Sequence, residues 1–252
     1  MKGIFVTGTD TGVGKSVITA GLTSLMRKRG VDCVAIKPVE TGCKLLNGEV
    51  FPQDGDLLWR ASEKSISLDD TTPFRFSLPA SPYRAAALQN SRLRISDITE
   101  HIMAIKENHD LIIVEGAGGL FAPIEAKLSF IDLMNELSFP IVLVARSKLG
   151  TINHTMLSLE ALTRRNMDIL NVILSKCDME EGPEEQYTPD DLKRMIFPVP
   201  FFQFPFLGGS ILENPLEISS LMEKLWTKEG FLEYFNLCLK YKDCRVKNNT
   251  VI

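Results

Sequence analysis

Cysteine and histidine are scarce in this sequence, and their spacing does not indicate a disulfide-stabilised or zinc-bound fold. The 252 residues include five cysteines and three histidines, and no two cysteines form a CxxC pair. An odd number of cysteines argues against a disulfide framework, and the scattered histidines argue against a metal cluster. We therefore expect reduced thiols at Cys33, Cys43, Cys177, Cys238 and Cys244.

Long apolar runs and an excess of basic residues are also missing. No stretch approaches the roughly 20 apolar residues that span a bilayer. Met1–Val6 leads directly into a strand pattern, where a signal peptide would have an apolar core and a cleavage site. Acidic residues outnumber basic ones, 32 to 28, for a formal net charge of −4, which disfavours binding along a nucleic acid backbone. These absences predict a cytoplasmic protein with no nucleic acid partner and no membrane partner.

What the sequence does contain is typical of a folded chain with a sizeable core. Hydrophobic residues make up 44% and charged residues 24%, and the length suits one large domain or two small ones. Short, nearly continuous apolar runs alternate with segments of helical period, as expected for strands covered on both faces. The sequence therefore predicts an α/β fold in which a mostly parallel sheet has helices on both faces, with strands at Gly3–Thr7, Cys33–Ile36, Leu111–Val114, Ile141–Ala145 and Ile169–Leu174.

Three helices have recognisable starts or apolar faces. The first follows Gly14 and ends at Gly30, with three basic residues in its last turn, where the helix dipole favours positive charge. Ser96 is expected to cap a second helix. A third is expected from Thr151 to Arg165, with apolar residues at helical spacing.

Other regions fit this alternation poorly. The segment from Glu40 to Arg94 contains several Pro and Ser residues and one weak helix, Asp56–Ser62, so we interpret it as a long excursion over the strand ends. Proline interrupts Phe197–Phe206, which favours an edge strand followed by a loop. We expect one domain over residues 1–226, followed at 227–252 by a helical extension with a frayed tail.

The strongest functional signal is the glycine-rich segment Gly8–Ser16, GTDTGVGKS, between the first strand and the first helix. This is the context of a phosphate-binding P-loop, in which backbone N–H groups and a helix N-terminus surround phosphate oxygens. Lys15 would reach the outer phosphates, and the Ser16 hydroxyl would ligate Mg²⁺. The spacing is unusual, because five residues separate Gly8 from Gly14 where the common motif has four.

A P-loop needs a carboxylate for its metal ion, and the strand Leu111–Val114 carries one to the carboxyl edge of the sheet. Glu115 follows this strand directly, and small residues after it leave room for a ligand. Mg²⁺ prefers one or two carboxylates together with phosphate and water oxygens. Asp54 from the excursion is our second candidate, with Asp56 competing for the role, and either residue also fits a helix cap or a solvated acid.

Two further segments are expected at the same sheet edge. Lys37 ends the strand Cys33–Ile36. A lysine there is often merely solvated, but near ATP it offers positive charge to an anionic reacting group. Lys148–His154, KLGTINH, follows the strand Ile141–Ala145 and opens a helix. The N–H groups of Gly150–Asn153 suit a carboxylate, although a glycine turn with Thr151 as cap accounts for the same pattern.

Four motifs, at these spacings and in this order, resemble the dethiobiotin synthetase family: Val6–Lys15, Lys37–Val39, Val114–Gly119 and Lys148–His154. The resemblance implies a single-domain P-loop fold and an ATP-dependent ligase. Such a ligase closes the ureido ring of dethiobiotin from 7,8-diaminononanoate and CO₂. One amine forms a carbamate, the carbamate oxygen attacks the γ-phosphate to give a carbamic–phosphoric anhydride, and the second amine closes the ring, releasing ADP and phosphate.

The resemblance also implies roles for residues of this chain. Lys15 and Lys37 would be catalytic, stabilising the carbamate and the transferring phosphoryl oxygens, and Mg²⁺ would be held by Ser16, Asp54 and Glu115. The nucleotide would contact Gly12, Val13, Gly14, Lys15, Ser16, Val17, Glu115, Gly116, Ala117, Gly118, Ser175, Pro205, Phe206 and Leu207. The other substrates would contact Thr11, Lys37, Thr41, Gly150, Thr151, Ile152 and Asn153, the last four from the second subunit of a homodimer with shared active sites.

Some positions depart from the family pattern. Ser16 and Thr41 stand where threonine and serine are common, and both keep the hydroxyl. Ser175 stands where members often have an asparagine that reads the adenine edge, and a hydroxyl has less reach and donor capacity than an amide. Weak discrimination among nucleoside triphosphates is therefore expected. Gly208–Ser210 is an insertion after the base-contacting loop, so no later base contact is assigned.

Rival interpretations stay open at this point. A nucleotide-switched P-loop ATPase acting as a binding protein would carry an additional lysine early in the loop, where this chain has Asp10. An amide-forming ligase of cobyrinate type normally has a fused glutaminase domain, for which 252 residues leave no room. The sequence neither indicates nor excludes a catalytically inactive scaffold.

Overall fold

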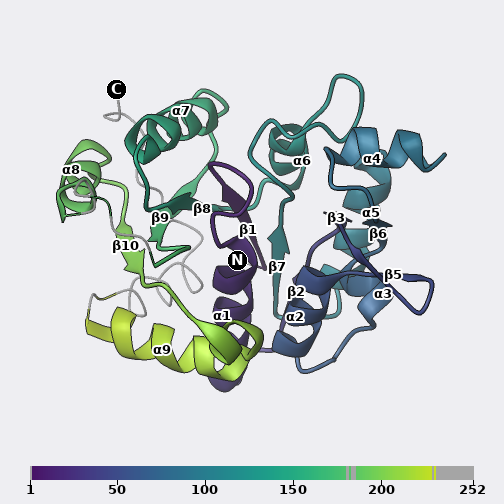
Figure 1. The fold of residues 1–252 in the computed structure, drawn as a ribbon, viewed down its shortest axis with the longest axis horizontal. Helices are drawn as coiled ribbons and strands as arrows, with labels where there is room; N and C mark the ends of the chain where they lie inside the picture. The colour runs from purple at the N-terminus through teal and green to yellow at the C-terminus, as the bar shows by residue number, and fades with distance from the viewer. Residues whose placement is uncertain (1, 180–181, 183–185, 229, 231–252) are drawn as a thin grey trace.

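The central sheet contains the five strands that the sequence predicts, and four of them run one residue further at their carboxyl ends. The computed structural model describes residues 2–179, 182, 186–228 and 230 (Figure 1). All strand pairs of this six-stranded sheet are parallel, in the spatial order β10-β9-β8-β1-β7-β2. The strands are β1 (Gly3–Gly8), β2 (Cys33–Ile36), β7 (Leu111–Glu115), β8 (Ile141–Arg146), β9 (Ile169–Ser175) and β10 (Phe201–Phe204).

Side chains from the sheet enter two separate cores because successive residues of a strand point to opposite faces. On β1, Ile4 and Val6 lie in the core under α1 and α9, whereas Phe5 lies in the opposite core. This arrangement confirms the predicted α/β fold with helices on both faces. One layer holds α1 (Lys15–Lys28), α9 (Pro215–Lys228) and α2 (Gln53–Ala61), and the other holds α5 (Ile95–Lys106), α6 (Phe130–Leu137), α7 (Thr151–Thr163) and α8 (Thr188–Met195).

The predicted helix ends are correct for α1 and need adjustment for α5 and α7. Helix α1 has Arg27 and Lys28 in its last turn, as expected. Ser96 is not the cap of α5, because the helix begins at Ile95. The N–H of Ile95 donates to Glu125 Oε1 at 2.8 Å, so a distant carboxylate satisfies the helix start that Ser96 was expected to cap. Helix α7 starts at Thr151 as predicted and ends two residues before Arg165.

The excursion after β2 is much more structured than expected. β3 (Val39–Thr41) pairs in parallel with β6 (Phe74–Phe76), and β4 (Lys44–Leu46) forms a hairpin with β5 (Glu49–Phe51). Three-residue strands are too short for a periodic signal. However, the Asn47-Gly48 turn, with positive φ at both residues, was a readable hairpin sign. Helix α2 begins three residues before the predicted Asp56, and α3 (Leu68–Thr71) and α4 (Pro82–Leu88) follow.

The C-terminal part of the described chain packs on the first helix. Strand β10 is an edge strand followed by a loop, as predicted, and the short 3-10 helix η2 (Gly209–Glu213) leads into α9. A Cβ at Gly21 of α1 would lie 2.4 Å from Met222 of α9, so this glycine allows the two helices to approach closely. The expected boundary at residue 226 falls inside α9, and residues 231–252 of the expected extension lie outside the described residues.

Of the five cysteines, Cys33, Cys43 and Cys177 are free thiols, and Cys238 and Cys244 lie outside the described residues. The described part of the chain contains no helix of the length and apolarity needed to cross a membrane.

Candidate functional site

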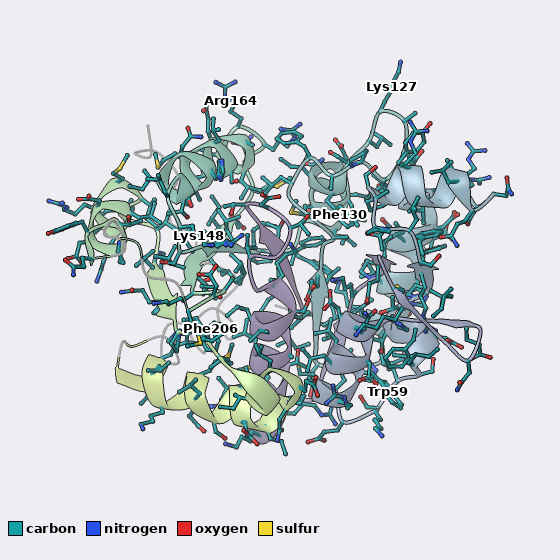
Figure 2. All side chains as sticks on the ribbon, in the orientation of Figure 1. Trp59, Lys127, Phe130, Lys148, Arg164 and Phe206 are labelled. Atoms are coloured by element: carbon teal, nitrogen blue, oxygen red, sulfur yellow. The ribbon has the colours of Figure 1, made fainter. Side chains whose placement is uncertain are left out.

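A cleft of about 980 Å³ opens at the carboxyl edge of the sheet, above β1 and β2. Its walls come from the P-loop, from Lys37 and Asp54, from the loop after β7, and from the loops after β9 and β10. Figure 2 draws the side chains and labels Phe206, which lines the cleft from the loop after β10. This is the edge where parallel α/β sheets bind ligands.

The P-loop has the backbone shape that its glycines allow. Gly12 and Gly14 have φ values of +71° and +91°, and Gly14 is the N-cap residue of α1. Lys15 is buried in this loop, with its Nζ 2.9 Å from the carbonyl oxygen of Asp10. Burial, together with the nearby charge of Lys37, lowers the pKa of Lys15 to about 8. A bound anion such as a phosphate would raise the pKa of Lys15 again, because a nearby negative charge favours the charged form of a lysine.

Lys37 is a buried ammonium between two carboxylates from different elements. Its Nζ lies 2.9 Å from Glu115 Oε1 and also contacts Asp54 Oδ2. Burial alone would lower the pKa of Lys37, but Glu115 and Asp54 raise it above its usual value. Lys37 is thus a permanent positive charge at the cleft wall.

Asp54, rather than Asp56, faces the site. Burial would raise the pKa of Asp54, but Lys37 and hydrogen bonds from Lys37 and Ser16 hold it below the usual value. Asp56 instead accepts a hydrogen bond from Arg60 Nε at 2.9 Å within α2. The structure therefore brings only the first of the two candidate acids towards Lys37.

Ser16, Asp54 and Glu115 converge on one point, and their chemistry fits a hard cation. The Ser16 hydroxyl donates to Glu115 Oε1 at 2.7 Å, and Glu115 Oε2 is buried without a hydrogen-bond partner. Among the described residues no cluster of three or more His, Cys, Asp or Glu side chains is present, so a cation here would also use a hydroxyl and phosphate oxygens. That donor set is typical of Mg²⁺.

Most of the predicted contact residues line the cleft. They are Thr11, Gly12, Gly14, Lys15, Ser16, Val17, Lys37, Thr41, Asp54, Ala117, Gly118, Ser175, Pro205, Phe206 and Leu207. Three others are not part of the cleft lining: Val13 and Glu115 are buried, and a Cβ at Gly116 would lie 3.2 Å from Phe5. These residues come from sequence positions up to 196 residues apart, from Thr11 to Leu207.

The predicted carboxylate site at Gly150–Asn153 does not line this chain's own cleft. Gly150 is the N-cap residue of α7, and Thr151 is buried with its hydroxyl unpartnered. His154 and two residues further along α7, Leu157 and Ser158, line the cleft instead. The family resemblance places residues 150–153 in the site of a second subunit, so their position here is compatible with that expectation.

Sequence reasoning missed several other cleft residues because they carry no motif. These residues come from the loop before α4, from the loop after β7 and from the β9 end: Pro79, Ala80, Ser81, Pro82, Leu120, Phe121, Ala122, Pro123, Lys176 and Cys177. Ser81 precedes a proline at the first position of α4, which is a helix-start signal that could have located this wall.

Gly14→Ala is expected to weaken ATP binding more than tenfold. A Cβ at this position would lie 2.7 Å from Ser175 Oγ, and the φ of +91° is strained for any L side chain. Isothermal titration with ATP measures the loss. Gly30→Ala is the matched control, because it has a φ of +79° with nothing near its Cβ; it should cost stability and leave ATP affinity unchanged. Equal ATP affinity in the two variants would contradict this account of the loop.

Comparisons with solved structures support the fold. MinD from Aquifex aeolicus matches with a TM-score of 0.55 at 15% identity, covering 96% of this chain and 98% of that one. A ParA family ATPase from Chlorobium tepidum matches with a TM-score of 0.52 at 14% identity, covering 96% and 100%. At such low identity the likeness extends to the fold alone.

Comparisons of sequence identify the family. Residues 2–202 match a family model described as an AAA domain. The ATP-dependent dethiobiotin synthetase BioD of Bacillus licheniformis is 38% identical over 211 residues, covering 82% of this chain and 85% of the relative. The enzyme of the same name from Bacillus velezensis is 34% identical over 235 residues, covering 88% and 97%. With this identity over most of both lengths, the chain belongs to the ATP-dependent dethiobiotin synthetase family.

Proposed function

We propose that the protein is an ATP-dependent ligase that closes the ureido ring of dethiobiotin from 7,8-diaminononanoate and CO₂. The observation that carries the proposal is the pair of buried lysines, Lys15 and Lys37, on one cleft with a P-loop. Both lysines line the cleft, and burial together with the nearby charge of Lys37 lowers the pKa of Lys15. Two cations in one cleft suit a reaction in which a carbamate and a γ-phosphate, both anionic, must meet.

The chemistry asks for positioning and charge neutralisation more than for a covalent nucleophile. The P-loop amides and Lys15 hold the phosphates, while Lys37 faces the carbamate oxygen that attacks the γ-phosphate. Thr11 and Thr41 also line the cleft, and in this proposal their hydroxyls contact the carbamate. Ring closure by the second amine then breaks the carbamic–phosphoric anhydride and releases phosphate.

Ser16, Asp54 and Glu115 are the residues we propose for Mg²⁺. When bound, the ion neutralises charge on the transferring phosphoryl group. Lys37 already contacts both carboxylates, so the same pair of acids orients the catalytic ammonium. Asp54 and Glu115 therefore connect the proposed metal site to Lys37, the residue that faces the carbamate in this proposal.

A homodimer completes the site in this proposal. The N–H groups at the start of α7, Gly150–Asn153, hold the diamine's carboxylate in the cleft of the other subunit. Leu149, beside them, is 84% exposed in the single chain, so the start of α7 is accessible to a second subunit. We place the enzyme in the cytoplasm, where its small polar substrates are dissolved.

A nucleotide-switched binding protein is not favoured, although the fold neighbours include ATPases. Asp10 stands where such a switch would carry its additional lysine, and its carbonyl oxygen accepts a hydrogen bond from Lys15 Nζ at 2.9 Å. The buried Lys37, placed at the cleft between two acids, instead suits a reaction on a second anion.

A phosphate-release assay tests the proposed reaction. Purified protein with ATP and Mg²⁺ should release phosphate only when both the diamine and bicarbonate are present, because the carbamate is the nucleophile. Omission of either compound is the control. Equal ATP hydrolysis without the diamine would favour a switch ATPase and would contradict the ligase.

Lys37→Gln is expected to lower kcat about 100-fold or more, and to change the Kd for ATP less than about threefold. The lost charge acts on the reacting carbamate, whereas the P-loop still holds the nucleotide. Steady-state kinetics and ATP titration separate these quantities. Lys64→Gln, at an exposed lysine beyond α2, should resemble the wild type. Unchanged kcat in Lys37→Gln would remove Lys37 from the mechanism.

Ser175 is expected to give weak discrimination among nucleoside triphosphates. Its short side chain is buried at the cleft wall beside Cys177, and a hydroxyl distinguishes base edges less well than an amide does. Competition between ATP and GTP in the ring-forming assay should give kcat/KM ratios within about tenfold, and Ser175→Ala should change the ratio little. A strong preference for ATP would refute this interpretation.

A further inference from the structure

Glu40 is a buried carboxylate that the roles proposed above leave unused. It lies on β3, three residues after Lys37, and is only 4% exposed. Its Oε1 accepts the N–H of Asp54 at 3.1 Å, and its Oε2 accepts the N–H of Gly55 at 2.8 Å. Both donors belong to the first turn of α2, where N–H groups have no partner within the helix. Glu40 therefore caps α2 from a different element.

The start of α2 depends on this cap because its own residues do not provide one. Pro52 is the N-cap residue and makes no side-chain cap hydrogen bond. The backbone bond that opens the helix, from Asp56 N to Pro52 O at 2.9 Å, leaves the N–H groups of Asp54 and Gly55 to the carboxylate of Glu40. A carboxylate near a helix N-terminus also interacts favourably with the helix dipole.

The same turn is also closely packed against Thr72. A Cβ at Gly55 would lie 2.2 Å from Thr72 Oγ1 and 3.2 Å from Pro52 Cβ. The turn thus has both the hydrogen bonds to Glu40 and this close contact to hold it. The side chain of Asp54 leaves this turn towards Lys37 and Ser16, so the position of the turn decides where the Asp54 carboxylate lies.

We propose that Glu40 is a positioning residue that fixes the first turn of α2 and so holds Asp54 against Lys37 and Ser16. The inference rests on the metal site proposed above, because Glu40 reaches that site through Asp54, although its charge also lies near Lys37. A carboxylate suits this task since both of its oxygens accept a hydrogen bond. A glutamine would accept one N–H and direct its own NH₂ group at the other.

Metal binding without turnover tests this role. Mn²⁺ replaces Mg²⁺, and electron paramagnetic resonance measures its affinity for the full-length protein saturated with a non-hydrolysable ATP analogue. Glu40→Gln is expected to weaken Mn²⁺ binding about tenfold, as is typical when a group that orients a metal ligand is lost. Asp54→Asn should weaken it at least as much. Asp56→Asn is the matched control, because Asp56 lies in the same turn but pairs with Arg60, and it should bind Mn²⁺ like the wild type.

The double variant Glu40→Gln with Asp54→Asn separates positioning from a general loss of stability. If Glu40 acts through Asp54, the double variant binds Mn²⁺ no more weakly than Asp54→Asn alone. Additive losses, or wild-type Mn²⁺ affinity in Glu40→Gln, would overturn the proposal. If Glu40→Gln does not fold, Glu40→Asp takes its place, with the same non-additivity expected.

The two proposals fail in different ways. Unchanged Mn²⁺ affinity in Asp54→Asn would remove Asp54 from the metal site and the role of Glu40 with it. Weakened affinity in Asp54→Asn with normal affinity in Glu40→Gln would overturn the role of Glu40 alone. Neither readout depends on the diamine, so the ring-forming function is tested independently by the phosphate-release assay.

Discussion

The buried ammonium of Lys37 is the interaction on which the rest of the site depends. Two carboxylates, one from the end of β7 and one from the start of α2, share this one cation. The two buried charges, Lys37 and Glu115, would not be stable in the interior alone, because a buried charge requires a partner and hydrogen bonds. The ion cluster therefore ties β2, β7 and α2 together at the sheet edge. Any ligand cation that approaches Asp54 and Glu115 meets acids whose orientation Lys37 has already restricted.

The parallel sheet explains why these groups meet at all. Strands β1, β7 and β2 are neighbours in the sheet, and all three end at the same edge, so the P-loop, Glu115 and Lys37 converge without any special loop. Residues 99 positions apart in the chain, Ser16 and Glu115, come within 2.7 Å in this way. Asp54 is different, because it reaches the edge from the excursion and needs a tertiary contact to hold it.

Features at the ends of the central strands can be predicted from the sequence, whereas features that depend on tertiary contacts cannot. Continuous apolar runs locate the buried strands, and a strand followed by GTDTGVGKS locates the phosphate loop, because both signals are local. The hairpin and the short strands of residues 39–76 give too little periodicity. The choice between Asp54 and Asp56 depends on which side of α2 faces Lys37, which spacing alone does not define. Glu40 was missed because its two hydrogen-bond donors lie 14 and 15 residues away and are backbone groups.

Different parts of the chain therefore determine the fold of this protein and the reaction that we propose for it. The six-stranded sheet resembles that of MinD and ParA ATPases at 14–15% identity, and a shared sheet leaves the reaction undetermined. The phosphate loop accounts for a nucleotide, but not for a second anionic reactant. In the proposed reaction a second anionic reactant requires positive charge beside the γ-phosphate. Lys37, which contacts Glu115 and Asp54, is the residue we propose for that charge. The segment after β2 contributes Asp54, which contacts Lys37. This segment thus adds to the nucleotide-binding sheet the groups that suit the site to ligation.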